Sequence, residues 1–184
     1  MDEYIDIVDI NGKPTGQTEL KSVIHQKGYY HNTVHIWFYT SDGEILLAQR
    51  SAKKTICPLL WDVSVAGHID AGETIKQAAK REILEEIGIK VSKKDLKKIG
   101  VYKCFQTYDN GIMDNEFHHA FICDLDHKFH RIKLQEEEVQ GVKLVSALEF
   151  RNFLDDIEKD NQHFIASNKA YYEAIFENIL SAIT

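Results

Sequence analysis

Residues 67–89, GHIDAGETIKQAAKREILEEIGI, carry strong helix signals at both ends. Thr74 and Gln77 have the spacing of a capping box, in which two side chains satisfy free backbone N–H groups of the first turn. Gly88 suits the left-handed conformation that commonly follows the last residue of a helix. The sequence therefore predicts a helix over about residues 75–87, preceded by a glycine-containing loop.

This helix would have one acidic and one apolar face. At roughly 100° per residue, the acidic sector holds Glu82, Glu85 and Glu86, and the apolar sector holds Ile83, Leu84 and Ile87. Glu73 adds a fourth carboxylate at the start of the helix, and Arg81 lies four residues before Glu85, which offsets part of the like-charge repulsion. Three glutamates by themselves are typical of a solvated helix face. A metal-binding role is indicated only if the surrounding residues also match a known motif.

Nine positions of this segment resemble the Nudix box position for position: Gly67, Glu73, Arg81, Glu82, Ile83, Glu85, Glu86, Gly88 and Ile89. The resemblance to the Nudix superfamily implies an α/β/α sandwich around a mixed β-sheet, and it spans most of the chain. We therefore expect a single domain over residues 1–184, with the box at residues 67–89 and a C-terminal helical extension at residues 147–184.

Nudix proteins cleave a nucleoside diphosphate linked to another group, X, with the help of Mg²⁺ or Mn²⁺. The resemblance thus implies a metal-dependent pyrophosphohydrolase acting on acid anhydrides. Such cations prefer oxygen ligands, and by analogy with the family Glu82, Glu85 and Glu86 bind the metal while Arg81 orients the carboxylates. A water activated by the metal, and by a carboxylate such as Glu86 or Glu116, would attack one phosphorus.

Three flanking segments resemble one branch of the superfamily, the isopentenyl diphosphate isomerases and their hydrolase relatives. They read VIHQKGYYHNTVHIWFY, ILLAQRSAKKTICPLLWDVSVAGH and GIMDNEF. In the isomerases, histidines and acids in comparable segments hold a metal. The residues in similar places here are His25, His31, His68, Asp114 and Glu116, although the interval from His25 to His31 is one residue shorter than in the isomerases.

Each histidine also has a structural interpretation, because a lone histidine is more often a hydrogen-bonding surface or core residue than a ligand. We expect His35, on a predicted strand, to be structural. His68 follows the loop glycine Gly67, and its context favours a metal ligand or a phosphate contact.

Ala66 argues against the isomerase reaction. The isomerases move a double bond with a cysteine immediately before the loop glycine, opposite a glutamate. Here that place is taken by Ala66, whose methyl group cannot transfer a proton. The complete set of box glutamates also favours hydrolysis. Isopentenyl diphosphate isomerase remains the alternative, and a non-catalytic diphosphate-binding module is a third possibility.

Basic and aromatic residues outside the box are further candidates for substrate contacts. Arg50, Lys53 and Lys54 could meet phosphate oxygens, for which arginine is best suited; a solvated basic patch is the alternative. With Gly67 and His68, Arg50 and Lys54 complete the expected substrate-binding set. The aromatic residues that could stack on a base are Trp37, Trp61, Phe105 and Tyr108, although aromatic residues in strands usually belong to the core.

The composition, 43% hydrophobic and 28% charged, is that of a globular protein. No run of residues is long enough to span a bilayer, and the first residues lack a basic, apolar leader, so we expect a cytoplasmic protein without a membrane partner.

A net charge of −7 argues against binding a nucleic acid polymer but not against a small-molecule diphosphate substrate. A homodimer is one of the oligomeric states left open. The three cysteines show no CxxC spacing, so neither a disulfide framework nor a zinc site is expected.

Periodicity and turn signals predict an alternation of strands and helices in one unit. The expected strands are residues 4–10, 33–40, 45–50, 61–66, 99–106, 116–125 and 142–145, with the first at a sheet edge and the second and third forming a hairpin. The expected helices are residues 19–27, 75–87, about 147–157 after a Ser146–Glu149 capping box, and 167 onward.

Overall fold

The computed structural model describes residues 2–125 and 129–183; residues 1, 126–128 and 184 of the predicted domain lie outside this description. In chain order the elements are β1 (Tyr4–Val8), β2 (Pro14–Leu20), α1 (Lys21–Lys27), β3 (His31–Tyr39), β4 (Ile45–Arg50), β5 (Trp61–Asp62), β6 (Val65–His68), α2 (Ile75–Ile87), β7 (Lys97–Thr107), β8 (Met113–Asp124), η1 (Phe129–Arg131), β9 (Val139–Val145), α3 (Ala147–Asp155), η2 (Ala166–Asn168) and α4 (Lys169–Ile183).

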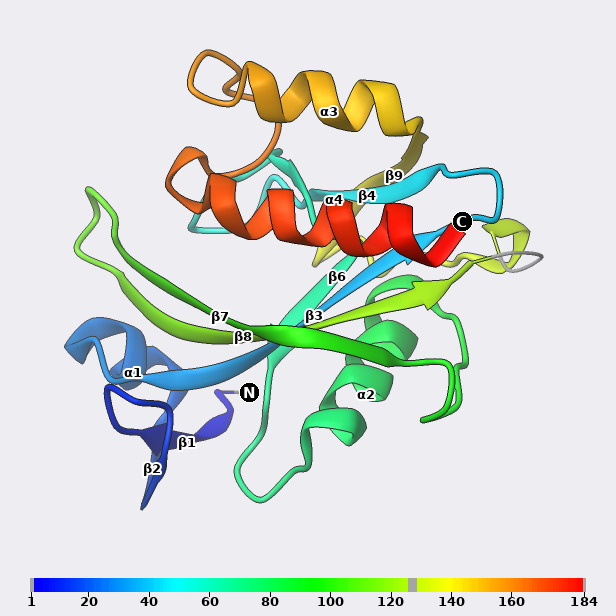
Figure 1. The fold of residues 1–184 in the computed structure, drawn as a ribbon. Helices are drawn as coiled ribbons and strands as arrows, with labels where there is room; N and C mark the ends of the chain where they lie inside the picture. The colour runs from blue at the N-terminus through cyan, green and yellow to red at the C-terminus, as the bar shows by residue number, and fades with distance from the viewer. Residues whose placement is uncertain (1, 126–128, 184) are drawn as a thin grey trace.

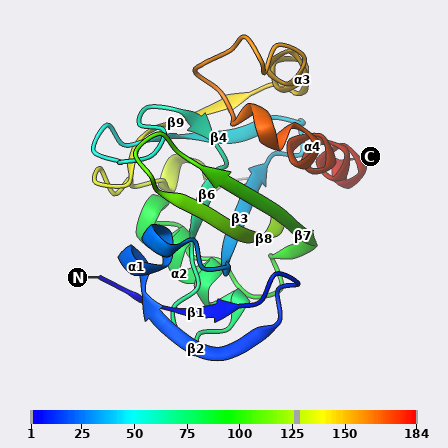
Figure 2. The same cartoon turned by 90° about the vertical axis from the view of Figure 1, so that its left-hand side faces the viewer.

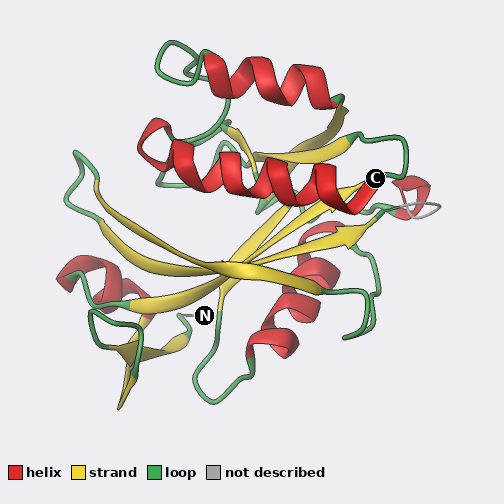
Figure 3. Cartoon of the chain, viewed as in Figure 1, coloured by secondary structure: helices red, strands yellow, loops and turns green. Residues whose placement is uncertain are grey.

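Among the described residues, nine strands form one mixed sheet between two helical layers (Figures 1 and 3). Helix α2 covers one face, and α3 and α4 cover the other (Figure 1). Strand β3 lies at the centre, parallel to β8 and antiparallel to β6. Its side chains alternate between two cores: Ile36 packs with residues of α2, whereas Trp37 packs with residues of α3 and α4. This is the predicted α/β/α sandwich around a mixed sheet.

Helix α2 has the predicted bounds. The Thr74–Gln77 capping box is present, and Gly88 takes the left-handed conformation with φ of 70°. Ile83 and Ile87 are fully buried against the sheet, as expected for residues one turn apart. Leu84 differs from the prediction, because it is 46% exposed. It is rotated by about 100° from Ile83, which places it at the margin of the buried stripe.

Two predictions about the strands are wrong in detail, and a third is confirmed over a short length. Strand β1 is not an edge strand, because β2 pairs along its outer side. Strands β3 and β4 form the predicted antiparallel hairpin, but their pairing is confined to Tyr39 and Ile45, and the rest of β4 pairs with β5 and β9. The predicted strand at residues 61–66 is two short strands, β5 and β6, which pair with different neighbours.

Strands β1 and β2 and helix α1 gather at the end of the molecule opposite α3 (Figure 2). The C-terminal part follows the prediction, since the Ser146–Glu149 capping box opens α3, and η2 leads into α4. Within the part of the chain that the structure describes, Cys57, Cys104 and Cys123 form no disulfide with one another. Among the helices of the described residues, none combines the length and hydropathy that a membrane-spanning segment requires.

Candidate active site

The acidic face of α2 is organised by one arginine. Arg81 Nη1 donates to Glu82 Oε1 at 2.7 Å and to Glu85 Oε2 at 3.2 Å. Its Nη2 donates to Glu73 Oε2 at 2.9 Å and to the backbone carbonyl oxygen of His68 at 3.0 Å. Arg81 therefore ties two of the predicted metal ligands to the loop that precedes the helix.

Glu86 lies deeper than the other two glutamates and is 8% exposed. The backbone N–H of Ala66 points to its Oε2 at 3.4 Å. Burial, reinforced by the charge of Glu82, raises the pKa of Glu86 to about 8. Burial also raises the pKa of Glu82 to about 7, against the opposing effect of Arg81. Arg81 compensates the charge of Glu82 only in part and makes no hydrogen bond to Glu86, so a bound cation would supply the remaining positive charge.

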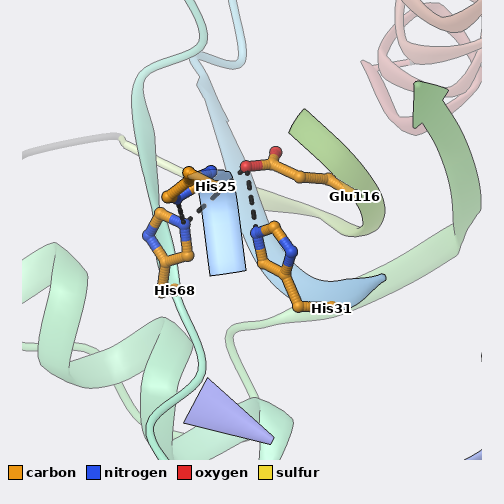
Figure 4. A group of neighbouring side chains, drawn as sticks. All are labelled: His25, His31, His68 and Glu116. Carbon is orange, nitrogen blue, oxygen red and sulfur yellow. Dashed lines mark hydrogen bonds and ion pairs between the residues drawn. The ribbon is translucent and has the colours of Figure 1, made fainter. Parts of the chain in front are cut away.

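A second polar cluster, termed here the histidine cluster, consists of His25, His31, His68 and Glu116. These residues come from α1, β3, β6 and β8, and their side chains converge on one point (Figure 4). One ligand atom from each lies within 4.8 Å of the others. His25 Nε2 is 3.1 Å from His68 Nε2, and Glu116 Oε1 is 3.4 Å from His31 Nε2 and 3.7 Å from His68 Nε2.

Contacts behind the cluster orient two of its imidazoles. The carbonyl oxygen of Tyr29 lies 3.0 Å from His31 Nδ1, so Nδ1 carries the proton and Nε2 turns a lone pair toward Glu116. Asp114 Oδ1 lies 2.9 Å from His25 Nδ1, on the side away from His68. Asp114 thus contacts the rear of a cluster histidine, and it is not among the four residues that converge, although the sequence resemblance grouped it with them.

Glu116 joins the cluster to the sheet. It is well buried, and burial raises its pKa, but the nearby imidazoles, His31 foremost, outweigh this effect and hold the pKa well below its usual range. Its second oxygen, Oε2, is 3.4 Å from His118 Nδ1. An ionised carboxylate beside three imidazoles forms a ligand set that suits Zn²⁺ and first-row transition-metal ions, including Mn²⁺.

One cavity of about 730 Å³ joins the α2 glutamates to the histidine cluster. Of the residues in the expected metal-binding, catalytic and substrate-binding sets, all but one line this cavity: His25, Arg50, Lys54, Gly67, His68, Arg81, Glu82, Glu85, Glu86, Asp114 and Glu116. The exception, His31, is fully buried and sits behind the cavity wall. The structure therefore brings together residues that are separated by up to 91 positions in the sequence, from His25 to Glu116.

The basic candidates separate into two groups. Arg50 and Lys54 line the cavity; Arg50 Nε donates to the carbonyl oxygen of Ile56 at 3.0 Å, and Lys54 pairs with Glu138. Lys53 does not line it; its exposed ammonium pairs with Glu137 at 3.1 Å, and its contact with phosphate stays a prediction.

Of the aromatic candidates, Tyr108 alone lines the cavity. Trp37 is fully buried in the core and cannot stack on a base. The ammonium of Lys143 covers the ring of Trp61 at 4.3 Å, and Phe105 packs against Phe117 at 5.7 Å between ring centroids. Burial excludes stacking on a base for Trp37, whereas Trp61 and Phe105 lie outside the cavity lining and their stacking role stays a prediction.

Sequence reasoning missed several polar residues of the cavity wall, notably Asp62, His118 and Tyr172. Asp62 offered a signal, because a single acid between Trp61 and Val63 in a partly buried strand is expected to have a partner or a ligand. His35, predicted to be structural, hydrogen-bonds Tyr171 at 2.9 Å and stacks on His118 with 3.8 Å between ring centroids. It also lines the cavity.

Comparison with known proteins identifies this arrangement. The family described as "NUDIX domain" matches residues 29–167, which include the acidic helix and most of the histidine cluster. The chain belongs to the Nudix family. It is a Nudix hydrolase, and Nudix hydrolases act on small molecules and generally use divalent metal ions.

Among the similar proteins of known sequence are a Nudix hydrolase and an isopentenyl-diphosphate isomerase. Nudix hydrolase 3 of Arabidopsis thaliana is 38% identical over 158 residues, which cover 83% of this Nudix chain and 20% of the plant protein. The chain thus spans about a fifth of the length of that relative. Isopentenyl-diphosphate Delta-isomerase 2 of Photorhabdus laumondii is 33% identical over 156 residues, covering 85% of this chain and 84% of the isomerase.

Solved structures share the Nudix fold. DR0079 of Deinococcus radiodurans superposes with a TM-score of 0.71 at 16% identity, over 94% of this chain and 99% of that chain. The dihydroneopterin triphosphate pyrophosphohydrolase of E. coli superposes with a TM-score of 0.57 at 22% identity, over 80% and 95% of the two chains.

Proposed function

We propose that this Nudix hydrolase cleaves the diphosphate linkage of a nucleoside diphosphate or related X-diphosphate compound, using Mg²⁺ or Mn²⁺. The observation that carries the proposal is the convergence of Glu82, Glu85 and Glu86 on a cavity whose opposite wall holds a second donor cluster. Hard cations take a few carboxylates together with phosphate oxygens, and this wall offers that chemistry.

The histidine cluster fits a second cation. His31 Nε2 is a buried nitrogen without a hydrogen-bond partner, while its Nδ1 is committed to Tyr29. The separations of 3.1 and 3.4 Å between donor atoms of the cluster suit ligands that bind one ion at about 2.1 Å. His25, His31, His68 and Glu116 would hold this ion, and Asp114 would orient His25.

The bound cations would neutralise the diphosphate, polarise phosphorus and lower the pKa of an attacking water. Arg81 positions Glu82 and Glu85 through its two hydrogen bonds. Glu86 receives no bond from Arg81, since its contact is the Ala66 N–H at 3.4 Å. Glu86 therefore keeps acceptor capacity for a proton from water, and Glu116 is the alternative base.

Arg50 and Lys54 would contact phosphate oxygens from the side of the cavity formed by the loop after β4. Both line the cavity. The Arg50 Nε–H holds the Ile56 carbonyl, which leaves its two terminal nitrogens for a bidentate contact. Lys54 would exchange its partner Glu138 for the substrate.

The proposal is tested by assaying release of phosphate or nucleoside monophosphate across a panel of diphosphate compounds, with and without Mg²⁺ or Mn²⁺. Glu86→Gln should abolish metal-dependent turnover and weaken Mn²⁺ binding measured by titration calorimetry, while leaving the melting profile cooperative. Glu137→Gln, which changes an exposed glutamate outside the cavity, is the matched control. Unchanged turnover and Mn²⁺ affinity in Glu86→Gln would refute the metal assignment.

Isomerisation of isopentenyl diphosphate is the second candidate, and the histidine cluster favours it through the resemblance to the isomerases. Against it, Ala66 lines the cavity where the isomerases carry a cysteine. Cys104 also lines the cavity, but burial raises its pKa to about 12, which makes its thiol a poor acid. Incubation with isopentenyl diphosphate decides the matter, because appearance of dimethylallyl diphosphate at a rate comparable to hydrolysis would reverse the ranking.

A further inference from the structure

The wall of the cavity that faces α4 carries polar groups that belong neither to the α2 glutamates nor to the histidine cluster, although one of them, His35, has a ring nitrogen within 4.8 Å of ligand atoms of Glu116 and His118. Asp62, on β5, and His35, on β3, both line the cavity there, together with Tyr172 of α4. A cavity of about 730 Å³ has the size of a pocket for a whole ligand and so extends beyond the diphosphate. These groups are therefore available to contact X.

Asp62 is oriented by a chain of two hydrogen bonds. The backbone N–H of Ile165 donates to Tyr172 Oη at 3.2 Å, and Tyr172 Oη lies 3.2 Å from Asp62 Oδ2. Because the hydroxyl already accepts from Ile165, its proton points to Asp62. The N–H of Val63 donates to the other oxygen, Oδ1, at 2.7 Å. Tyr172 is 1% exposed, so the hydroxyl has a fixed place.

These bonds leave Asp62 with unused acceptor capacity. A carboxylate offers about four lone-pair sites, of which Val63 and Tyr172 occupy two. Within residues 2–125 and 129–183, no lysine, arginine or histidine nitrogen forms an ion pair with Asp62. Burial raises its pKa to about 6, so the group is ionised at neutral pH but poorly compensated. A hydrogen-bond donor in the cavity would satisfy it.

His35 is oriented by a parallel chain that starts at Trp37. The indole Nε1–H can only donate, and it donates to Tyr171 Oη at 2.8 Å. Among the described residues, the other hydrogen-bond partner of Tyr171 Oη is His35 Nδ1, at 2.9 Å, so the hydroxyl proton is assigned to this bond. His35 then carries its own proton on Nε2, and stacking on His118 fixes the plane of its ring. The imidazole therefore offers its Nε2–H as a hydrogen-bond donor.

Two consecutive tyrosines of α4 thus fix one acceptor and one donor on the same cavity wall. Tyr172 fixes Asp62, and Tyr171 fixes His35. A prenyl chain has no polar atom for either group, and burying it there would leave both unsatisfied at a cost. A sugar or nucleoside has hydroxyl or amino groups that can donate to Asp62 and accept from His35.

We propose that Asp62 and His35 form a specificity subsite for a hydroxyl- or amino-bearing X group, which selects sugar- or nucleoside-type diphosphates over prenyl diphosphates. This inference rests on the proposed function for the position of the diphosphate. Tyr171 and Tyr172 are positioning residues of the subsite, because they act through His35 and Asp62.

Binding of three non-hydrolysable probes in the presence of Mg²⁺ tests the subsite by titration calorimetry. The probes are methylenediphosphonate, α,β-methylene-ADP and isopentenyl methylenediphosphonate, which present the diphosphate alone, with a nucleoside and with a prenyl group. The variants are Asp62→Asn and His35→Gln, and Asp156→Asn is the matched control for loss of an exposed aspartate. Thermal unfolding of each variant establishes that it is folded.

We expect the unmodified protein to bind the nucleoside probe at least about tenfold more tightly than either other probe, as one or two hydrogen bonds to a charged group provide. Asp62→Asn should lose most of that gain while its affinity for methylenediphosphonate stays within about twofold. An equal loss on all three probes, or no nucleoside gain in the unmodified protein, would overturn the subsite and leave the proposed function standing. Failure of every probe to bind with Mg²⁺ would instead contradict the proposed function, and the subsite with it.

Discussion

Gly67 lies directly against the carboxylate of Glu82: a β-carbon at position 67 would overlap the Glu82 side chain. The backbone of Gly67 does not have a positive φ, so conformational strain does not require glycine there. The requirement is the close approach of β6 to α2, which holds Glu82 in contact with Arg81 and the cavity.

Gly67→Ala should therefore displace Glu82 without unfolding the chain. A shift of a catalytic group by about 1 Å can cost about 100-fold in rate, and we expect kcat/KM with Mg²⁺ to fall by that order. The check is steady-state kinetics beside thermal unfolding. Gly141→Ala is the control, because a β-carbon at Gly141 meets only Trp61, at 3.9 Å. Full activity in Gly67→Ala would show that the position of Glu82 does not matter for turnover.

Removing one member of the histidine cluster should remove its metal. His31→Gln keeps the size of the side chain but loses the Nε2 lone pair that faces Glu116 at 3.4 Å. We expect the Mn²⁺ or Zn²⁺ affinity of this site to fall about 10- to 100-fold, as for loss of a group that orders a metal shell. Metal content after dialysis, measured by mass spectrometry, provides the check, with His130→Gln at an exposed position as the control. Identical metal content in both variants would show that the histidine cluster does not bind the metal.

Ser146 gives an independent test of how the C-terminal layer is held. Its hydroxyl accepts the N–H of Glu149 at 3.2 Å, and Glu149 Oε2 accepts the N–H of Ser146 at 2.8 Å. Ser146→Ala should lower the free energy of unfolding by about 1 kcal/mol. Urea denaturation measures the change, and the control is Ser181→Ala, at an exposed serine in the last turn of α4. Activity should not change, because Ser146 does not line the cavity.

Local signals in the sequence predicted the elements whose ends are marked by side chains. The bounds of α2 follow from Thr74, Gln77 and Gly88, and its acidic face follows from helical periodicity. Strand β2 was missed because PTGQTEL is exposed and polar along most of its length, so it lacks the alternation that marks a half-buried strand. The prediction of a single domain over the whole chain stays a prediction.

The site could be predicted from the sequence only in part, because its geometry depends on pairing between strands that are far apart in the chain. The histidine cluster was grouped by family resemblance, but its distances depend on the register of β3 with β6 and β8, which no local pattern encodes. Asp62 and Tyr172 are 110 residues apart, and their hydrogen bond depends on how α4 docks on the sheet. Residue spacing could therefore indicate the α2 glutamates but not the wall that faces α4.

The buried carboxyl of Asp62 should make stability depend on pH. Burial raises its pKa from 3.8 to about 6, so the folded protein binds the proton more tightly than the unfolded chain. The stabilisation from this proton is complete below pH 3.8 and is lost as pH rises through about 6. Between pH 5 and 7.5 the unmodified protein should lose about 1 kcal/mol relative to Asp62→Asn, which has no titrating group there. Urea denaturation of both proteins across this range measures the difference. Asp156→Asn should follow the unmodified protein at every pH, and parallel curves for Asp62→Asn would show that Asp62 does not titrate in this window.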